Sequence, residues 1–407
     1  MAETTLEVDS QEPSSLEASE PRSFEREPDE FDVEKEDTSS EEITEPYDPS
    51  KIRVSRRGPT ISNLMDMIRH EELDMAPEFQ RHGGIWTEKT QSRLIESILM
   101  GIPLPAFYFD ATSDDKWLVV DGLQRLTALA RFLLTPEELE KRVGQKPLWL
   151  GDLEFLKELK GKRFDDLPRR FQRDINQTQL TSYVIEQGTP EELKFNIFRR
   201  INTGGLPLSS QEIRHALNQG QATRLLAQLA NSPEFKQATA NGISGKRMAD
   251  RECVLRFLAF VENSPEIYKY HDFDLFLSRQ MQNINKLPPR ELEKLEKRFL
   301  RAMKAATRIF DNDAFRKRFS KNAPRSPINK ALFEAWAVNL DRVNDHTIEL
   351  LVDKKEELID WFIELNNEID FERAISQGTG DIKKVRLRFA EIRRIIQEVA
   401  PLEDRQE

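Results

Sequence analysis

The chain is poor in residues that build covalent or metal-based scaffolds: its 407 residues include one cysteine, Cys253, and five histidines. A single cysteine excludes an intrachain disulfide and a zinc site made of cysteines. Asp345-His346, the nearest candidate for a ββα-metal nuclease, lies in a helical pattern without a supporting asparagine. His271, followed by Asp272 and Asp274, fits a turn between helices better than a metal site. The histidines therefore do not favour a metal nuclease in the C-terminal half.

Long apolar runs are also missing. The longest uncharged stretch, 97–109, is too short to span a bilayer and contains two prolines. No basic segment followed by an apolar one opens the chain, as a secretory signal would. We therefore expect a soluble, cytoplasmic protein. Neither G-x-x-x-x-G-K-S/T nor G-x-G-x-x-G is present, so a conventional P-loop site is not expected.

Acidic charge is concentrated at the N-terminus. The chain has 61 basic and 72 acidic residues, a net charge of −11. Residues 1–50 hold 18 acidic and 3 basic residues, which leaves the other 357 residues with a net charge of +4. This segment has too few large apolar residues to offset its ordering entropy, so residues 1–48 are predicted to be disordered. They would act as a solubilising extension or as an electrostatic mimic of nucleic acid.

Hydrophobic periodicity divides the remainder into a mixed part and a helical part. The patterns predict helices over 61–72, after Thr87, after Asp121 and from about 190, and strands over 106–109, 117–120 and 182–186, with 140–180 charged and irregular. Beyond about residue 220 the periodicity is helical, for example over 253–261, 292–310, 328–340 and 347–365. We therefore expect an α+β domain over 49–220 and an all-helical domain over 221–400.

Two identical pentapeptides, Thr135-Pro136-Glu137-Glu138-Leu139 and Thr189-Pro190-Glu191-Glu192-Leu193, are each typical of a helix start. Ser209 with Glu212 predicts a capping box for a further helix. The pentapeptides are therefore interpreted as helix starts and not as an internal repeat.

The most informative segment is Asp121-Gly122-Leu123-Gln124-Arg125-Leu126-Thr127, between an apolar run and an amphipathic stretch. A strand, a tight turn and a helix are expected. Such a turn directs backbone N–H groups and a helix N-terminus at one spot, which favours a bound anion. Arg125 and Gln124 could donate to a phosphate, and Asp121 could hold a cation. Alternatively, Asp121 and Gln124 form a capping box that only starts the helix.

Basic residues recur in the helical half. They are Arg316, Lys317, Arg318, Lys321 and Arg325, and then Lys383, Lys384, Arg386, Arg388, Arg393 and Arg394. If they share one face they would follow a DNA backbone, and binding would depend on salt. Otherwise they are solvated faces balanced by neighbouring glutamates.

Four segments, taken in order, resemble the N-terminal domain family of GmrSD-type restriction endonucleases. They are Phe79-Gln80-Arg81 with Trp86, Leu94 to Leu99 followed by Ile102-Pro103-Leu104-Pro105, Asp121 to Thr127, and Phe198 to Gly205 with Leu208 and Glu212. Together they cover about residues 55–220, and residues 247–257 add a weaker similarity. The resemblance implies a ParB/sulfiredoxin-like fold for this part, and no HNH nuclease domain is evident.

The resemblance also implies nucleotide binding, with Mg²⁺-dependent NTP hydrolysis, in DNA restriction and antiphage defence. It assigns catalysis to Asp121, Gln124 and Arg125, nucleotide contacts to Gln80, Arg81, Gly122, Arg200 and Asn202, and Mg²⁺ to Asp121. Leu123 departs from the family, which commonly has glutamine there. Arg200 and Asn202 are about 200° apart on an ideal helix, so both reach one site only if the helix ends before Asn202.

Three functions remain open from the sequence. The first is an NTP-binding and NTP-hydrolysing sensor or regulatory protein that contacts DNA or a partner effector such as a nuclease. The second is a non-catalytic module for nucleic acid or protein, in which the Asp121 turn is a structural cap. The third is a metal-dependent DNA nuclease that uses the Asp121 motif.

Overall fold

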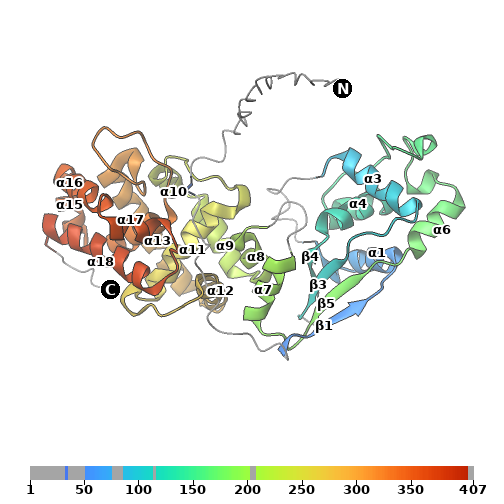
Figure 1. Ribbon diagram of the computed structural model, residues 1–407, viewed down its shortest axis with the longest axis horizontal. Coiled ribbons are helices and arrows are strands. Elements are labelled where there is room, and N and C mark those ends of the chain that lie inside the picture. The colour runs from blue at the N-terminus through green and yellow to red at the C-terminus, as the bar shows by residue number, and fades with distance from the viewer. Residues whose placement is uncertain (1–32, 35–50, 76–85, 113–115, 202–207, 402–407) are drawn as a thin grey trace, which may run out of the picture.

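The structure is a computed structural model that describes residues 33–34, 51–75, 86–112, 116–201 and 208–401. It is elongated, with a mixed α+β region at one end and a helical region at the other (Figure 1). The α+β class with a helical C-terminal region, predicted from periodicity, is thus confirmed. Within the described ranges, no helix is both long and apolar enough to cross a membrane.

The α+β region is built on a five-stranded sheet of order β1-β5-β3-β4-β2. The strands are β1 (Val54–Arg57), β2 (Leu73–Asp74), β3 (Phe107–Ala111), β4 (Trp117–Asp121) and β5 (Ser182–Glu186). β5 pairs antiparallel with β1 and parallel with β3, while β4 pairs antiparallel with β3 and parallel with β2. β5 has the predicted bounds, and the β3–β4 pair confirms the predicted neighbouring strands.

Side chains alternate along the strands and give the sheet two buried faces. Phe107, Phe109 and Val119 belong to one apolar cluster. Val120 and Ile185 belong to another, on the opposite face. Because successive side chains of a strand point to opposite sides, one strand contributes to two cores, and helices must cover both.

The first face is covered by helices α1 (Ile61–Arg69), α3 (Glu88–Leu99), α4 (Leu123–Leu133), α5 (Pro136–Arg142) and α6 (Arg169–Gln177). α6 corrects the prediction of an irregular segment over 140–180. It has few apolar residues and follows Pro168, but its Ile175 is fully buried, so tertiary packing and not periodicity stabilises the helix.

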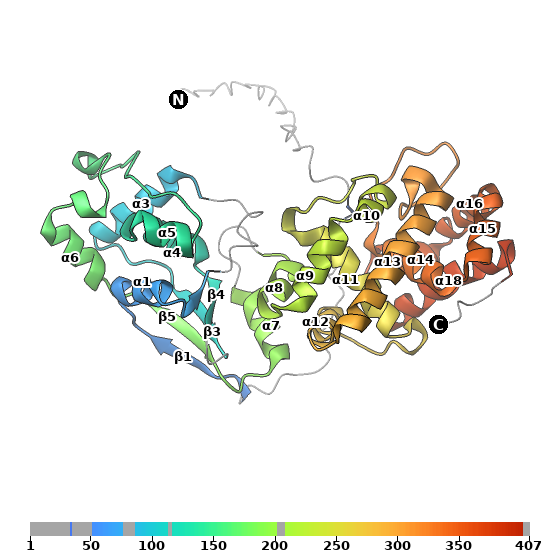
Figure 2. The ribbon, with the colours of Figure 1, turned by 180° about the vertical axis from the view of Figure 1, so that it is seen from behind.

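The second face is covered by α7 (Glu191–Ile201) and α8 (Ser210–Leu217), which lie between the sheet and the helical region in both ribbon views (Figures 1 and 2). Phe195 and Phe198 of α7 and Ile213 of α8 pack on Val120 and Ile185. α8 also contacts α11 (Ala249–Glu262) and α12 (Phe273–Ile284) of the helical region. It is therefore one of the elements through which the α+β region meets the helical region.

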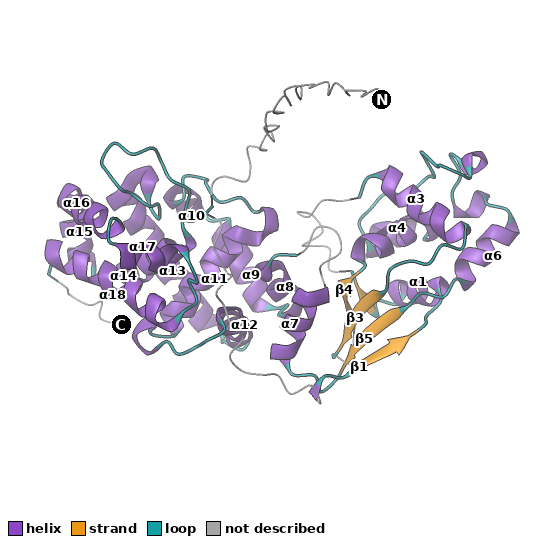
Figure 3. Cartoon of the chain, in the orientation of Figure 1, coloured by secondary structure: helices purple, strands orange, loops and turns teal. Residues whose placement is uncertain are grey.

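The helical region contains no named strand among its described residues, as Figure 3 shows by colour. Its helices are α9 (Gln221–Ala230), α10 (Pro233–Ala238), α11 (Ala249–Glu262), α12 (Phe273–Ile284), α13 (Pro289–Phe310), α14 (Lys330–Arg342), α15 (Asp345–Asp353), α16 (Lys355–Asn366), α17 (Ile369–Ser376) and α18 (Ile382–Val399). They enclose one large apolar core in which α14, buried along most of its length, contacts α11, α13, α17 and α18.

A chain of largely buried ion pairs joins α8 to this core. It runs through Asp274, Arg214, Glu252, Arg256, Glu334 and Arg388, on helices α12, α8, α11, α11, α14 and α18. Lys330 adds a third cation to Glu252, at 3.0 Å. Each buried charge has a partner of opposite sign, as burial in a low dielectric requires.

The predicted helix starts are confirmed at three positions. Thr87 caps α3, Thr135 forms a capping box with Glu138, and Ser209 forms one with Glu212. Thr189, in the second pentapeptide, has a different contact: its hydroxyl exchanges hydrogen bonds with the backbone of Arg53, at 3.2 and 3.4 Å. The same pentapeptide thus precedes two helices, but Thr135 bonds to its own helix and Thr189 bonds to Arg53.

The acidic N-terminal segment was predicted to be disordered over residues 1–48. Apart from Val33 and Glu34, these residues lie outside the described part of the chain. Those two residues are fixed on the helical region, where Val33 pairs with Ile328.

Candidate functional site

Gly122 forms the turn between β4 and α4. It is the N-cap residue of α4 with φ +100° and ψ 7°, in the left-handed region. A Cβ atom there would lie 2.4 Å from Cδ1 of Phe107 and 3.3 Å from an Nη atom of Arg125. Both the backbone angle and the space therefore require glycine, which brings the start of α4 close against β3.

No described side chain caps the N-terminus of α4. The alternative interpretation of Asp121 and Gln124 as a capping box is therefore wrong. Because Gly122 is the N-cap residue, Asp121 lies one residue too early, and the Gln124 side-chain oxygen instead accepts a hydrogen bond from the Trp86 N–H at 3.2 Å. The first turn of a helix has N–H groups without intrahelical partners, which makes it an anion-favouring position.

Arg125 is fixed within the protein. Its guanidinium donates to the carbonyl oxygens of Pro105 and, at 3.0 Å, Ala106, and to Asp121 Oδ2 at 2.9 Å. It also lies over the Phe107 ring, 4.3 Å from the centroid. Burial lowers the pKa of Arg125, an effect that the Asp121 carboxylate only partly offsets. Arg125 thus ties the loop before β3 to the start of α4, directly behind the helix N-terminus.

Asp121 is the acidic partner of this arginine, and its side chain is 27% exposed. Burial raises the pKa of Asp121, outweighing the attraction of Arg125 and a hydrogen bond from the Gly122 N–H. Among the described residues there is no group of three or more His, Cys, Asp or Glu side chains that could hold a metal. A single carboxylate already paired with a buried arginine does not fit a protein-held Mg²⁺ site.

Leu123, where the resemblance leads us to expect glutamine, is half-buried. It packs against a small cluster made by Ala216 of α8 and Met248. At this position the chain has an apolar contact between the start of α4 and the helical region in place of a polar group.

The turn before α11 lies against the start of α4 through Met248, and the sequence did not predict it as part of the site. Arg247 and Met248 both have positive φ, 60° and 58°, although neither is glycine. The Arg247 backbone oxygen accepts from Ser209 Oγ, and its guanidinium pairs with Glu212 Oε2 at 3.0 Å. Strained backbone of this kind costs free energy and is often found at functional sites. The weaker similarity that begins at Arg247 was the one signal for it in the sequence.

The structure thus brings Asp121, Gly122, Gln124 and Arg125 together at the start of α4. Arg200 is exposed on the last turn of α7, and its neighbour Arg199 approaches Asp274 at 3.8 Å. α7 ends at Ile201. Gln80, Arg81 and Asn202 lie outside the described residues.

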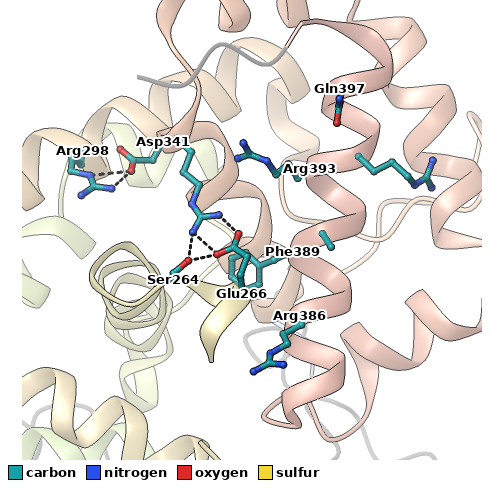
Figure 4. Close-up of a pocket in the computed structure, with 11 residues that line it drawn as sticks. Ser264, Glu266, Arg298, Asp341, Arg386, Phe389, Arg393 and Gln397 are labelled. Atoms are coloured by element: carbon teal, nitrogen blue, oxygen red, sulfur yellow. Dashed lines mark hydrogen bonds and ion pairs between the residues drawn. The ribbon is translucent and has the colours of Figure 1, made fainter. Parts of the chain in front are cut away.

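A second polar feature is a groove of about 840 Å³ in the helical region (Figure 4). It is lined by Ser264, Glu266, Arg298, Asp341, Arg342, Arg386, Phe389, Ala390, Arg393, Arg394 and Gln397. Five of these are arginines and two are acids, so the lining is positive. Three of the predicted basic residues of α18 (Arg386, Arg393 and Arg394) lie here.

Most groove arginines have protein partners that orient them. Arg342 binds Glu266 through two nitrogen atoms, and this pair, together with Ser264, outweighs desolvation and lowers the pKa of Glu266 to about 2. Arg298 binds the buried Asp341, and Arg386 donates to the Tyr268 carbonyl oxygen at 2.8 Å. A carbonyl oxygen carries no formal charge, so this contact does not neutralise Arg386.

Residues 61–218 match the family model of the GmrSD restriction endonuclease N-terminal domain. No curated protein matches the chain. The matched span begins at α1 and extends one residue past α8, so it contains the start of α4 and both helices on the second face of the sheet. Residues 61–218 are therefore similar to the N-terminal domain of GmrSD restriction endonucleases, which connects this part of the chain with DNA restriction.

Proposed function

We propose that the start of α4 binds the phosphates of a nucleoside triphosphate and supports its slow hydrolysis, in a protein of a DNA restriction or antiphage system. The observation that carries this proposal is the left-handed Gly122 turn at the end of β4, which opens α4 with no capping side chain among the described residues. The family match over residues 61–218 supports the same site, because the match includes this turn.

The described residues suggest distinct roles. The first-turn N–H groups of α4 and the helix dipole would neutralise phosphate charge. The Gln124 side-chain oxygen is bound to the Trp86 N–H, so its NH₂ group is the part that would donate to a phosphate or a water. Arg125 would not contact the phosphate but would hold the Gly122 turn in place through its bonds to Pro105, Ala106 and Asp121. The proposal keeps Gln80, Arg81, Arg200 and Asn202 as further phosphate contacts, as the resemblance implies.

A bound Mg²⁺ would neutralise phosphate charge, and it would depend mainly on phosphate and water oxygens, because Asp121 is paired with Arg125. Catalysis would then rest on positioning and charge neutralisation, with no covalent step on the protein. Because Asp121 would contribute little to holding the metal, we expect slow turnover.

The test is Gln124→Glu, in full-length protein titrated with each NTP. The new carboxylate still accepts from the Trp86 N–H and suits a helix N-terminus, so the unliganded melting temperature should be unchanged or slightly higher. Phosphate binding should weaken, because the added charge repels the ligand. We expect wild-type protein to gain a few degrees in Tm with saturating NTP, and the variant to lose most of that gain.

Gln237→Glu, the same change on an exposed residue of α10, is the matched control and should respond to NTP like wild type. Phosphate release would make the protein an NTP hydrolase. If no NTP changes the Tm of wild type, the non-catalytic module is favoured. Metal-dependent DNA cleavage without NTP would favour the nuclease.

A second candidate function, contact with a DNA backbone, is favoured by the arginine-lined groove. Arg386→Gln and Arg393→Gln should each weaken binding of a fluorescent duplex and reduce the slope of log K against log salt by about 1, as expected for one lost phosphate contact. Arg224→Gln, on an exposed position of α9 outside the groove, should leave the slope unchanged. Equal effects of all three substitutions would contradict groove binding.

A further inference from the structure

The N-terminal segment is anchored to the helical region at two residues. Val33 forms a parallel bridge with Ile328, and the Glu34 N–H donates to the Ile328 carbonyl oxygen over 2.8 Å. Ile328 also pairs antiparallel with Arg316. The two N-terminal residues therefore extend a short backbone ladder that the helical region provides, as peptides do when they add to a strand edge.

The Glu34 carboxylate occupies a specific receptor. Lys317 Nζ binds one carboxylate oxygen at 2.6 Å, and Asn329 Nδ2 donates to the other at 3.0 Å. The Lys317 side chain is only 10% exposed, and Asn329 is 1% exposed. Lys317 and Asn329, both largely buried, thus each bind one of the two carboxylate oxygens of Glu34.

The rest of this receptor is preorganised by the fold. Asn329 is the N-cap of α14: its Oδ1 accepts from the Leu332 N–H, and its Nδ2 also donates to the Ile375 carbonyl oxygen at 2.7 Å. Lys317 additionally contacts Ser376 at 2.6 Å and Glu372 at 3.4 Å. These contacts hold both donors in place, and loss of Glu34 would leave one amide hydrogen of the buried Asn329 without this acceptor.

We propose that Ile328, Lys317 and Asn329 form a docking site for an extended peptide that carries a glutamate. Its occupant is Val33-Glu34 of the same chain. Residues 1–32 carry 11 acidic and 2 basic residues, so the docked Val33-Glu34 pair is the point at which a strongly acidic segment joins the described chain. The 17 residue steps from Glu34 to Lys51 span at most about 60 Å, which limits how far this anchor lies from β1.

Hydrogen–deuterium exchange on the intact chain tests the proposal. The Glu34 amide should exchange at least about tenfold more slowly in wild type than in Glu34→Ala, because docking protects the Glu34 N–H. Lys317→Met should have the same effect from the receptor side. Glu36→Ala, which removes a carboxylate two residues away, is the matched control and should leave the protection unchanged.

Each other outcome overturns a defined part of the proposal. Wild-type exchange at the rate of an unstructured peptide would exclude docking. Protection that survives Glu34→Ala would exclude carboxylate recognition. Protection that falls on fiftyfold dilution would replace the same-chain occupant by a second copy, because docking within one chain does not depend on concentration. An unchanged unfolding midpoint of the helical region in each variant shows that the fold is retained.

Discussion

At the scale of single residues, Gly122 determines the geometry of the candidate site. We predict that Gly122→Ala lowers the free energy of unfolding by about 2 kcal/mol or more, because it adds the cost of a left-handed alanine to a collision with the Phe107 ring. Thermal or denaturant unfolding measures the effect. Gly58→Ala is the control, since a Cβ there meets nothing within 4 Å. Equal, small effects at both positions would show that the turn tolerates a side chain.

For Arg125, the sequence predicted the position but not the partners. The motif predicted correctly that a strand, a turn and a helix bring Asp121, Gln124 and Arg125 together. Its residue types did not reveal that Arg125 would be bound to the carbonyl oxygens of Pro105 and Ala106. Those acceptors lie about twenty residues earlier in the chain, and no local pattern encodes their approach. The phosphate role of Arg125 therefore stays a prediction.

At the scale of elements, α3 carries a buried glutamate that binds the backbone of a distant loop. Glu96 is buried, and its carboxylate accepts hydrogen bonds from the N–H groups of Glu154, Phe155 and Leu156, at 3.0, 2.7 and 2.8 Å. Desolvation alone would raise the pKa of Glu96, but these bonds outweigh it and the pKa is lowered. The helix therefore organises a loop about sixty residues later.

We predict that Glu96→Gln destabilises the protein by about 1–3 kcal/mol at neutral pH, because an amide NH₂ would face a backbone N–H. The pKa of Glu96 is lower in the folded than in the unfolded state. Its stabilisation is therefore present above the ordinary glutamate value of 4.5 and declines as the pH falls below it. The difference between wild type and variant, followed by denaturant unfolding from pH 7 to pH 3, should shrink on acidification.

The control for Glu96→Gln is Glu158→Gln, on an exposed residue of the loop that Glu96 binds. It should change the free energy of unfolding little at any pH. A stability difference for Glu96→Gln that stays constant down to pH 3 would contradict an ionised, hydrogen-bonded Glu96.

At the scale of the whole molecule, the buried ion pairs connect the matched domain with the helical region. Glu252 lies at their centre. Desolvation would raise its pKa, but Lys330, Arg256 and Arg214 outweigh this and hold the pKa of Glu252 well below its usual range. We predict that Glu252→Gln lowers the free energy of unfolding by about 3–5 kcal/mol, because buried cations lose their counter-charge. Denaturant unfolding measures the loss.

Glu262→Gln, exposed on the last turn of the same helix, is the matched control and should behave like wild type. Because the network includes Arg214 of α8, we expect the α+β region and the helical region to lose stability together in the Glu252 variant. A loss confined to one region would contradict that coupling.

The sequence by itself determined the class of the fold, most of the helices, the central strands and the similarity of residues 61–218 to a restriction endonuclease domain. These features depend on local periodicity, on caps such as Thr87 and Ser209, and on motifs within short segments. Only the tertiary structure decided which polar groups are buried and what they bind. Arg125, Glu96, Glu252 and Glu34 find their partners across turns, helices or almost the whole chain. Such contacts follow from the path of the backbone in space, which no window of neighbouring residues contains.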